Sequence, residues 1–276
     1  MALSRLFLLL IILGLALTAW AYRLATRAPV LREAEVRLDG LGGQAVRVVL
    51  ISDVHVAGPD MPPRRLAGIV AGINRLRPDL VVIAGDLVSD RLAATRHYSM
   101  DQAVAPLAGL RAKFGTFAVL GNHDHWRDAG EARAALARAG IRLLDNDAAR
   151  AGPLVVGGLD DAYTGRDDLA RTVGRMRSLG GVPVLLSHSP DPFARAPADV
   201  QLMLAGHTHC GQIRLPLIGA LSYMSEYGSR FGCGRINEGG RTLIVAAGLG
   251  TSMLPLRIGA APDYWLVTLR GEAGGS

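Results

Sequence analysis

Residues 46–55 read VRVVLISDVH, a β-branched apolar run that ends in an aspartate and, two residues later, a histidine. Such a run predicts a buried β-strand at Val46–Ser52. Asp53 and His55 then lie on the turn that leaves the strand. Because ligands of open α/β sheets bind at the carboxyl ends of strands, the stretch predicts a sheet strand with a candidate site beside it.

Four more polar segments follow predicted apolar strands further along the chain. All five contain aspartate, asparagine or histidine, and six of the seven histidines lie in or directly beside them. Each segment alone has an ordinary structural explanation, such as a helix cap, a turn or a buried structural histidine. A chain that needed histidine only for packing would not gather it at strand ends, so we interpret the segments as one metal site. They are Asp53-Val54-His55, Gly85-Asp86, Gly121-Asn122-His123-Asp124, His188 and Gly206-His207-Thr208-His209.

The remaining periodicity predicts an α/β protein. Strands alternate with helices early and dominate late, which favours a mixed sheet or a pair of sheets flanked by helices. The stretch Gly211–Gly240 has little periodicity, and a loop of that length is usually functional. Helices are predicted at Pro63–Leu76, Asp101–Lys113, Gly130–Ala139 and Asp167–Leu179, and strands at Val46–Ser52, Leu80–Ala84, Thr116–Leu120, Leu154–Val156, Val182–Ser187, Val200–Leu204, Leu243–Ala246 and Tyr264–Leu269.

The N-terminus predicts a membrane anchor. Leu6–Tyr22 reads LFLLLIILGLALTAWAY, 17 residues without a charge, close to the minimum for a spanning helix of about 20 apolar residues. Trp20 and Tyr22 lie where an interfacial aromatic belt would. A cleaved signal peptide is the alternative, because Ala19–Ala21 has the A-x-A form of a cleavage site. We therefore assign an anchor or signal peptide to residues 1–22, a linker leading into the domain to 23–45, and one domain to 46–270.

The orientation of the anchor depends on the arginines around it. Arg23, Arg27 and Arg32 follow the apolar span, against Arg5 and the α-amine before it. The positive-inside bias favours a cytoplasmic position of the domain by a small margin, and the side of the membrane stays open.

The whole chain of 276 residues has a net charge of +6 and an isoelectric point of about 9.9. Lys113 is the only lysine. An arginine excess could indicate a polyanionic partner, or only a coding preference of the genome. The arginines are scattered and form no dense basic stripe, so we do not expect a nucleic-acid partner.

The donor atoms of the five segments suit divalent cations such as Mn²⁺, Fe²⁺ or Zn²⁺. No thiolate is needed, and we interpret Cys210 as a small packing residue. Cys210 and Cys233 are too few for a disulfide framework. They could pair across a loop or remain two free thiols, so cysteine usage leaves the compartment open.

The ordered series D-x-H, G-D, G-N-H-D, a lone H and G-H-T-H is similar to that of the calcineurin-like metallophosphoesterase superfamily, over about residues 46–270. The runs GHTHCGQIRLP at 206–216, GGRTLIVAAGLGTS at 239–252 and GLDD at 158–161 resemble the membrane-associated bacterial YaeI/YkuE-like phosphohydrolases. The resemblance implies a metallophosphatase-like fold: two β-sheets packed as a sandwich flanked by helices, here after a transmembrane helix. It also implies a single-pass protein of the bacterial inner membrane.

The family pattern implies a site for two divalent cations. One cation would be held by Asp53, His55 and His209, and Asp86 would bridge to the other. The second cation would be held by Asn122, His188 and His207.

His125 matches no family role, and we expect it at the rim of the site.

The resemblance further implies hydrolysis of a phosphate ester. A hydroxide that bridges two metal ions would attack phosphorus in line. His123 would act as the general acid that protonates the leaving oxygen, oriented by Asp124.

The substrate is expected to be a phosphomonoester, phosphodiester or pyrophosphate at the membrane, with a lipid-linked phosphate as one option. The apolar patch LPLIGALSYM at 215–224, with Arg214, Arg230 and Arg235 nearby, could receive such a lipid or simply cover the sheet end. One alternative is a UDP-2,3-diacylglucosamine pyrophosphatase of lipid A synthesis. Others are a non-catalytic membrane-linked binding module on the same fold and a nuclease. No feature of the sequence indicates the oligomeric state.

Overall fold

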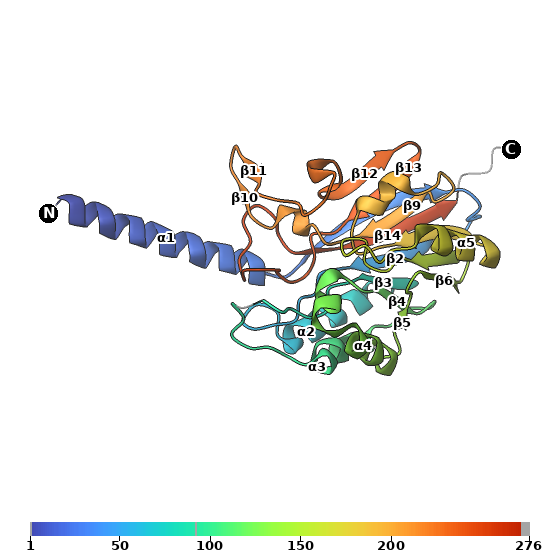
Figure 1. Ribbon diagram of the computed structural model, residues 1–276, viewed down its shortest axis with the longest axis horizontal. Coiled ribbons are helices and arrows are strands. Elements are labelled where there is room, and N and C mark those ends of the chain that lie inside the picture. Colours follow the sequence, from blue (N-terminus) through green and yellow to red (C-terminus); the bar gives the residue numbers. More distant parts are fainter. Residues whose placement is uncertain (1, 92, 272–276) are drawn as a thin grey trace.

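Two β-sheets packed face to face form the body of the protein, and one long helix projects from it (Figure 1). The computed structural model describes residues 2–91 and 93–271. The predicted apolar runs form the central strands of both sheets, and helices lie on the outer faces. The predicted α/β sandwich flanked by helices is therefore confirmed.

Each sheet contains six strands within the described residues. The first has the order β1-β14-β2-β3-β4-β5, and its neighbours are parallel except for the pair β14–β2. The second has the order β12-β13-β9-β8-β7-β6, with an antiparallel pair at each edge. The strands of the first sheet are β1 Val30–Leu38, β2 Val46–Ile51, β3 Leu80–Ala84, β4 Thr116–Val119, β5 Arg142–Leu143 and β14 Asp263–Gly271, and those of the second are β6 Asp147–Ala151, β7 Leu154–Gly158, β8 Val182–Leu186, β9 Leu202–Ala205, β12 Gly234–Glu238 and β13 Arg241–Val245; a small hairpin pairs β10 Arg214–Leu215 with β11 Gly219–Ala220.

The core explains why the central strands are apolar throughout. Val48 and Leu50 of β2 belong to the cluster between the two sheets, whereas Val49 and Ile51 belong to the cluster under the helices. Because successive side chains of a strand point to opposite faces, a strand buried on both faces needs an apolar residue at nearly every position.

Helices cover the outer face of each sheet. α2 (Pro63–Arg75) buries Leu66, Ile69, Val70 and Ile73, the spacing of one helix face. Residues of α3 (Met100–Val104) and α4 (Asn122–Arg138) belong to the same cluster on the first sheet. α5 (Leu169–Leu179) packs on the outer face of the second sheet.

The prediction of a helix at Asp101–Lys113 is correct for the first turn only. α3 ends at Val104, and the chain continues as a 3₁₀ turn over Ala105–Gly109. Pro106 lies at the start of that turn. Its ring nitrogen has no hydrogen to donate to the helix ladder, so the α-helix cannot run through it.

The helix predicted at Gly130–Ala139 begins eight residues earlier, at Asn122. Asp128 interrupts it with extended backbone angles (φ −178°, ψ 102°), and its side chain accepts the N–H of Glu131. The prediction therefore found only the segment after the interruption, which Asp128 caps as helix starts usually are. The G-N-H-D motif itself forms the first turn.

A strand that was not predicted lies within residues 23–45. β1 pairs in parallel with β14 at the edge of the first sheet. Only Val36 and Leu38 of this strand are buried, and charged residues alternate between its apolar ones. That pattern is too weakly apolar to distinguish an edge strand from a linker.

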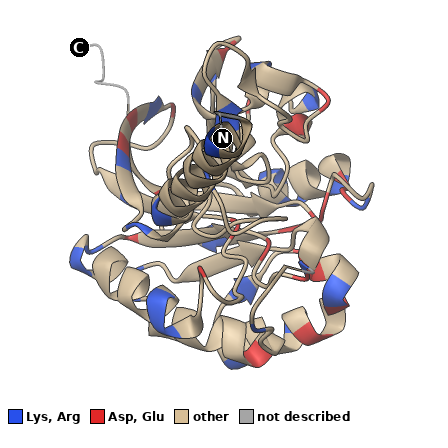
Figure 2. Ribbon diagram, turned by 90° about the vertical axis from the view of Figure 1, so that its left-hand side faces the viewer, with Lys and Arg blue, Asp and Glu red and all other residues tan. Residues whose placement is uncertain are grey.

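The projecting helix α1 (Ala2–Thr26) has the length and composition to cross a membrane. Its mean hydropathy over Leu3–Thr26 is 2.1, and its apolar window is not buried against the described chain. Its only charged residues are Arg5 and Arg23, and Lys and Arg are otherwise scattered over the molecule (Figure 2). At about 1.5 Å per residue, such a helix is long enough for an apolar layer about 30 Å thick.

Candidate metal centre

The predicted ligands meet where the carboxyl ends of strands from both sheets converge. Asp53 and His55 leave β2, Asp86 leaves β3, and Asn122 starts α4 after β4. The second sheet contributes His188 after β8, and His207 and His209 after β9. Backbone hydrogen bonds tie these turns together, from Asp53 N–H to Gly85 and from Gly206 N–H to His188.

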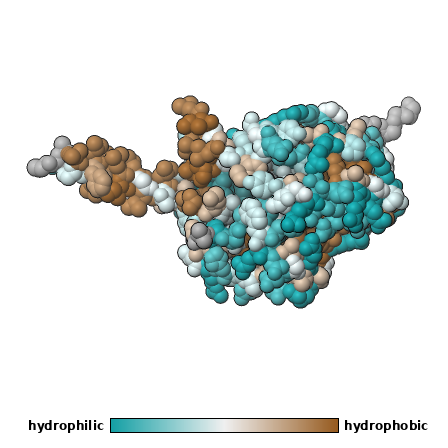
Figure 3. All heavy atoms as spheres, in the orientation of Figure 1, coloured by the Kyte–Doolittle hydropathy of each residue, from teal (hydrophilic) through white to brown (hydrophobic). Residues whose placement is uncertain are grey.

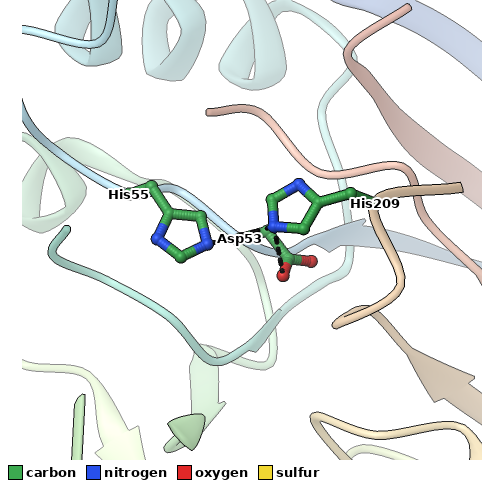
Figure 4. A group of neighbouring side chains, drawn as sticks. All are labelled: Asp53, His55 and His209. Carbon is green, nitrogen blue, oxygen red and sulfur yellow. Dashed lines mark hydrogen bonds and ion pairs between the residues drawn. The ribbon is translucent and has the colours of Figure 1, made fainter. Parts of the chain in front are cut away.

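The first group consists of Asp53, His55 and His209, which are buried and turned toward one another (Figure 4). The Nε2 atoms of His55 and His209 lie 3.1 Å apart. His209 Nε2 lies 3.4 Å from Asp53 Oδ1. One carboxylate and two imidazoles thus point their donor atoms at a common point.

The second group consists of Asn122, His188 and His207. His188 Nε2 lies 3.1 Å from Asn122 Oδ1 and 3.0 Å from His207 Nδ1. All three residues are buried. This group therefore offers one amide oxygen and two imidazole nitrogens.

Asp86 lies between the two groups. Its Oδ2 atom is 3.4 Å from His55 Nε2 and 3.3 Å from His188 Nε2. One carboxylate oxygen thus faces a histidine of each group, as a bridging ligand would.

Two of the histidines have their tautomers fixed by backbone carbonyls. His188 Nδ1 lies 2.7 Å from the carbonyl oxygen of Ala84 and donates to it. His207 Nε2 likewise donates to the carbonyl of Met224 at 2.9 Å. The opposite nitrogen of each ring then faces the second group and can bind a metal ion in place of a proton, the arrangement in which histidines bind metal ions.

Burial keeps three of the imidazoles neutral. It lowers the pKa of His55 and His209 well below the ordinary value, and that of His207 to about 4. Burial also lowers the pKa of His188, but the carboxylate of Asp86 overrides it and leaves this pKa raised. Without a metal ion, His188 and Asp86 thus form the ion pair of the site.

The donor set fits divalent cations. The neutral ring nitrogens of His55 and His209, which face each other at 3.1 Å, repel unless a proton or a cation lies between them. Histidine, aspartate and asparagine are suitable ligands for borderline divalent ions. Seven residues would share the charge: Asp53 with His55 and His209 on one side, Asn122 with His188 and His207 on the other, and Asp86 between them.

Close backbone approach at glycines makes room for the ligands. A Cβ built on Gly121 would overlap Oδ1 of Asp86 and lie 2.8 Å from Cε1 of His188. A Cβ on Gly206 would overlap Asp53. Glycine is the residue that allows backbone to pack this tightly against a functional side chain.

The predicted pairing of Asp124 with His123 is wrong. Asp124 is fully buried, and its carboxylate accepts the backbone N–H groups of Asp86, Leu87 and Gly121. Burial, together with the nearby carboxylate of Asp86, raises the pKa of Asp124 to about 7. Asp124 therefore holds the turns that carry the ligands.

Among the described residues, the carboxylate that contacts the His123 ring is Asp90, with Oδ1 2.5 Å from Nδ1. The ring centre of His123 lies 4.8 Å from that of His55, so His123 stands beside the first group of ligands. Asp90 follows Asp86 by four residues on the same loop. This was the one signal in the sequence that could have identified it.

The prediction that His125 lies at the rim of the site is wrong. Its side chain is 5% exposed, and its Nε2 lies 2.6 Å from Asp160 Oδ1. The rim instead carries Trp126 and Tyr163, which are exposed and contact each other edge to face. Trp126 also contacts the ring of His123, and Tyr163 that of His207.

Two further features lie next to His209. Cys210 forms a disulfide with Cys233, which decides between the alternatives that the sequence left open. Arg257 is fully buried, and its guanidinium donates to the carbonyls of Ala247 and Gly250 and lies 3.3 Å from His209 Nδ1. Burial lowers the pKa of Arg257 to about 10. Arg257 lies far along the chain from the five segments, so the sequence did not indicate its contact with His209.

Comparison with known proteins agrees with this geometry. A family model described as calcineurin-like phosphoesterase matches residues 46–211, which include every predicted ligand. The chain is 32% identical over 242 residues to metallophosphoesterase YkuE of Bacillus subtilis (strain 168), covering 83% of this chain and 80% of that one. It is 29% identical over 240 residues to a metallophosphoesterase of Aquifex aeolicus (strain VF5), covering 83% and 87%.

One vertebrate relative is a transmembrane protein that contains a metallophosphoesterase domain. The chain is 28% identical over 267 residues to a transmembrane protein with metallophosphoesterase domain from Danio rerio, covering 89% of this chain and 58% of that one. This relative and the apolar helix α1 indicate association with a membrane. By its matching domain and its relatives, the chain belongs to the calcineurin-like phosphoesterase family and is a metal-dependent phosphoesterase.

Proposed function

We propose that the protein hydrolyses phosphate esters at a membrane with two divalent cations held side by side. One would be held by Asp53, His55 and His209, with Asp86 between the two. The second would be held by Asn122, His188 and His207. The observation that carries the proposal is the position of Asp86 Oδ2, 3.4 Å from His55 Nε2 and 3.3 Å from His188 Nε2.

When bound, a pair of divalent cations acidifies a water molecule and neutralises charge on the phosphoryl oxygens. The chain itself supplies the proton for the leaving oxygen. His123 donates this proton from Nε2, while Asp90 accepts the hydrogen on Nδ1 and holds the ring in place. The leaving group lies against the exposed rings of Trp126 and Tyr163, which flank His123 and His207.

The test measures metal content by mass spectrometry and turnover of p-nitrophenyl phosphate and bis(p-nitrophenyl) phosphate, on full-length protein in detergent. Asp86→Asn loses metal and activity. His123→Asn keeps metal and loses about 10²–10⁴-fold in rate, the usual contribution of general acid catalysis. Asp90→Asn keeps metal and loses part of that factor, whereas His97→Asn, at an exposed histidine outside the site, changes neither quantity.

The opposite pattern, with metal lost in His123→Asn and kept in Asp86→Asn, would reject the role assignment. Full metal content without turnover on any substrate would leave the alternative of a non-catalytic binding module. A screen over monoesters, diesters, nucleotide-sugar pyrophosphates and lipid phosphates identifies the substrate. Selective cleavage of UDP-2,3-diacylglucosamine would establish the alternative role in lipid A synthesis.

The disulfide bears on which side of the membrane carries the domain. Disulfides persist in oxidising compartments and are rare in the cytosol. Arg23, Arg27 and Arg32 favour the cytoplasm, but only by a small margin over Arg5. The bond between Cys210 and Cys233 therefore carries more weight, and we propose that the domain lies on the oxidising side.

A further inference from the structure

Two neighbouring loops expose large apolar side chains to solvent. In the loop that contains β10 and β11, Leu217 is fully exposed, and Ile218 and Leu221 are 72% and 64% exposed. In the loop after β13, Met253 is 78% exposed and Leu254 about half. Single exposed apolar residues are ordinary, but a contiguous group of this size marks an interaction surface. We call these five residues the apolar loops.

Hydrogen bonds tie the two loops to each other. The side-chain amide of Gln212 donates to the carbonyls of Leu254 and Leu256. The backbone N–H of Arg214 donates to Ile258, and that of Ile258 donates back to Gln212. The apolar loops therefore form one surface with a fixed shape.

The same surface is joined to the end of α1. The backbone N–H of Arg257 donates to the carbonyl of Ala21 in α1, 3.1 Å away. Figure 3 shows the apolar projection of these loops beside the apolar surface of α1, on the same side of the molecule. Ala21 lies between Trp20 and Tyr22, with the exposed Arg23 following. Residues of these types occupy the boundary between lipid tails and water.

We propose that the apolar loops enter the interfacial layer of the membrane that α1 occupies. The partner is a lipid surface because the loops continue the apolar surface of α1 at the level of its aromatic and basic end. A second protein would have to cover α1 and the loops together. Removal of such side chains from water favours insertion. The insertion stands independently of the proposed catalytic function.

Insertion would place the metal centre near the lipid headgroups. Met224, which ends the loop around β11, accepts the hydrogen bond of His207 Nε2 through its carbonyl. The disulfide from Cys210 to Cys233 closes the same segment. The loop that meets the membrane is thus the loop that holds a proposed metal ligand.

The test uses tryptophan as a depth probe in the full-length chain, reconstituted in phosphatidylcholine vesicles with a minor share of phosphatidylglycerol. Ile218→Trp and Met253→Trp are made in a background without the native tryptophans (Trp20→Phe, Trp126→Phe and Trp265→Phe), so that only the introduced side chain emits. Arg175→Trp, on the exposed face of α5, is the matched control. Lipids brominated near the headgroup or deep in the acyl chains quench tryptophans at those depths.

Insertion predicts blue-shifted emission for Ile218→Trp and Met253→Trp and a large loss of intensity with lipids brominated near the headgroup. Arg175→Trp should show neither effect. Unquenched, red-shifted emission at both loop positions would overturn the proposal. Blue-shifted emission without quenching would also overturn it, because a protein surface, such as a second copy of the chain, would then cover the loops. An unchanged circular dichroism spectrum in each variant shows that the fold is intact.

Discussion

At the scale of single residues, the backbone of the site is held in a costly conformation. Asp53, His55, Asp86, His207 and His209 all have φ between 46° and 70°. Non-glycine residues rarely adopt this left-handed region, and each such residue costs of the order of 1–3 kcal/mol. The strands before them and the backbone hydrogen bonds between their turns hold these residues in place. The strain is concentrated on proposed ligands because it aims their side chains at a common point.

We predict that Gly121→Ala removes metal almost as completely as Asp86→Asn. The new methyl group would overlap Oδ1 of Asp86 and press on the ring of His188, so the bridging carboxylate must move. Metal content and turnover of the full-length variant measure the effect. Gly174→Ala is the control, because it lies within α5 with open space around it. That variant should keep its metal and gain up to about 1 kcal/mol in stability, as alanine does over glycine in helices.

Retained metal in Gly121→Ala would show that the neighbouring backbone can yield by several tenths of an ångström. The close contact would then not be what positions Asp86.

The sequence alone could identify the residues now proposed as ligands, but not all of their partners. Ligands such as His188 and Asp86 follow apolar strands, and parallel strands bring their carboxyl ends together. The contacts of Asp90 with His123 and of Arg257 with His209 depend on how loops pack across the site. Asp124 was paired with the wrong histidine because adjacent residues at the start of a helix point in different directions.

At the scale of secondary-structure elements, buried strands were predictable and boundaries set by hydrogen bonding were not. β2 and β3 are apolar on both faces and can be read directly from the sequence. β1 exposes most of its residues, so its pattern resembles a linker. α4 begins at Asn122, where a polar motif without helical periodicity gave no sign of a first turn. Asp124 starts this helix by accepting the N–H of Gly121 locally, and it also accepts the N–H groups of Asp86 and Leu87 from the neighbouring turn.

The disulfide between Cys210 and Cys233 closes a segment with a sequence separation of 23 residues. We predict that Cys210→Ser with Cys233→Ser lowers the free energy of unfolding by about 3 kcal/mol, from the chain entropy of a loop of this length. Metal affinity should also fall, because Cys210 directly follows His209 and shares its left-handed backbone. Denaturant unfolding and metal titration measure the two effects.

Reduction of the wild-type protein should reproduce both losses, and a reductant should leave the double variant unchanged. Equal stability of the oxidised protein and the double variant would show that the bond does not hold this segment.

At the scale of the whole molecule, α1 is docked on the domain rather than tethered by a free linker. Ala21 and Ala25, one turn apart, are buried against the domain. The guanidinium of Arg65 in α2 donates to the carbonyls of Ala25 and Arg27 at the end of α1. A cation at this position satisfies carbonyls that lack helical partners and interacts favourably with the helix dipole. The domain therefore has a defined orientation relative to α1, which the apolar loops require if they are to meet the same membrane.

We predict that Arg65→Met loosens this junction without unfolding the domain. Hydrogen bonds to charged groups contribute about 1.5–3 kcal/mol, so the open state of the junction should become about 10–100-fold more populated. Trypsin cleavage after Arg27, whose carbonyl Arg65 binds, should accelerate by that factor, because proteolysis follows the population of the open state. Arg64→Met is the matched control: it removes a neighbouring exposed arginine, so its cleavage rate after Arg27 should equal that of the wild type. Equal rates in both variants would mean that Arg65 does not hold α1, and the docking would then rest on the burial of Ala21 and Ala25.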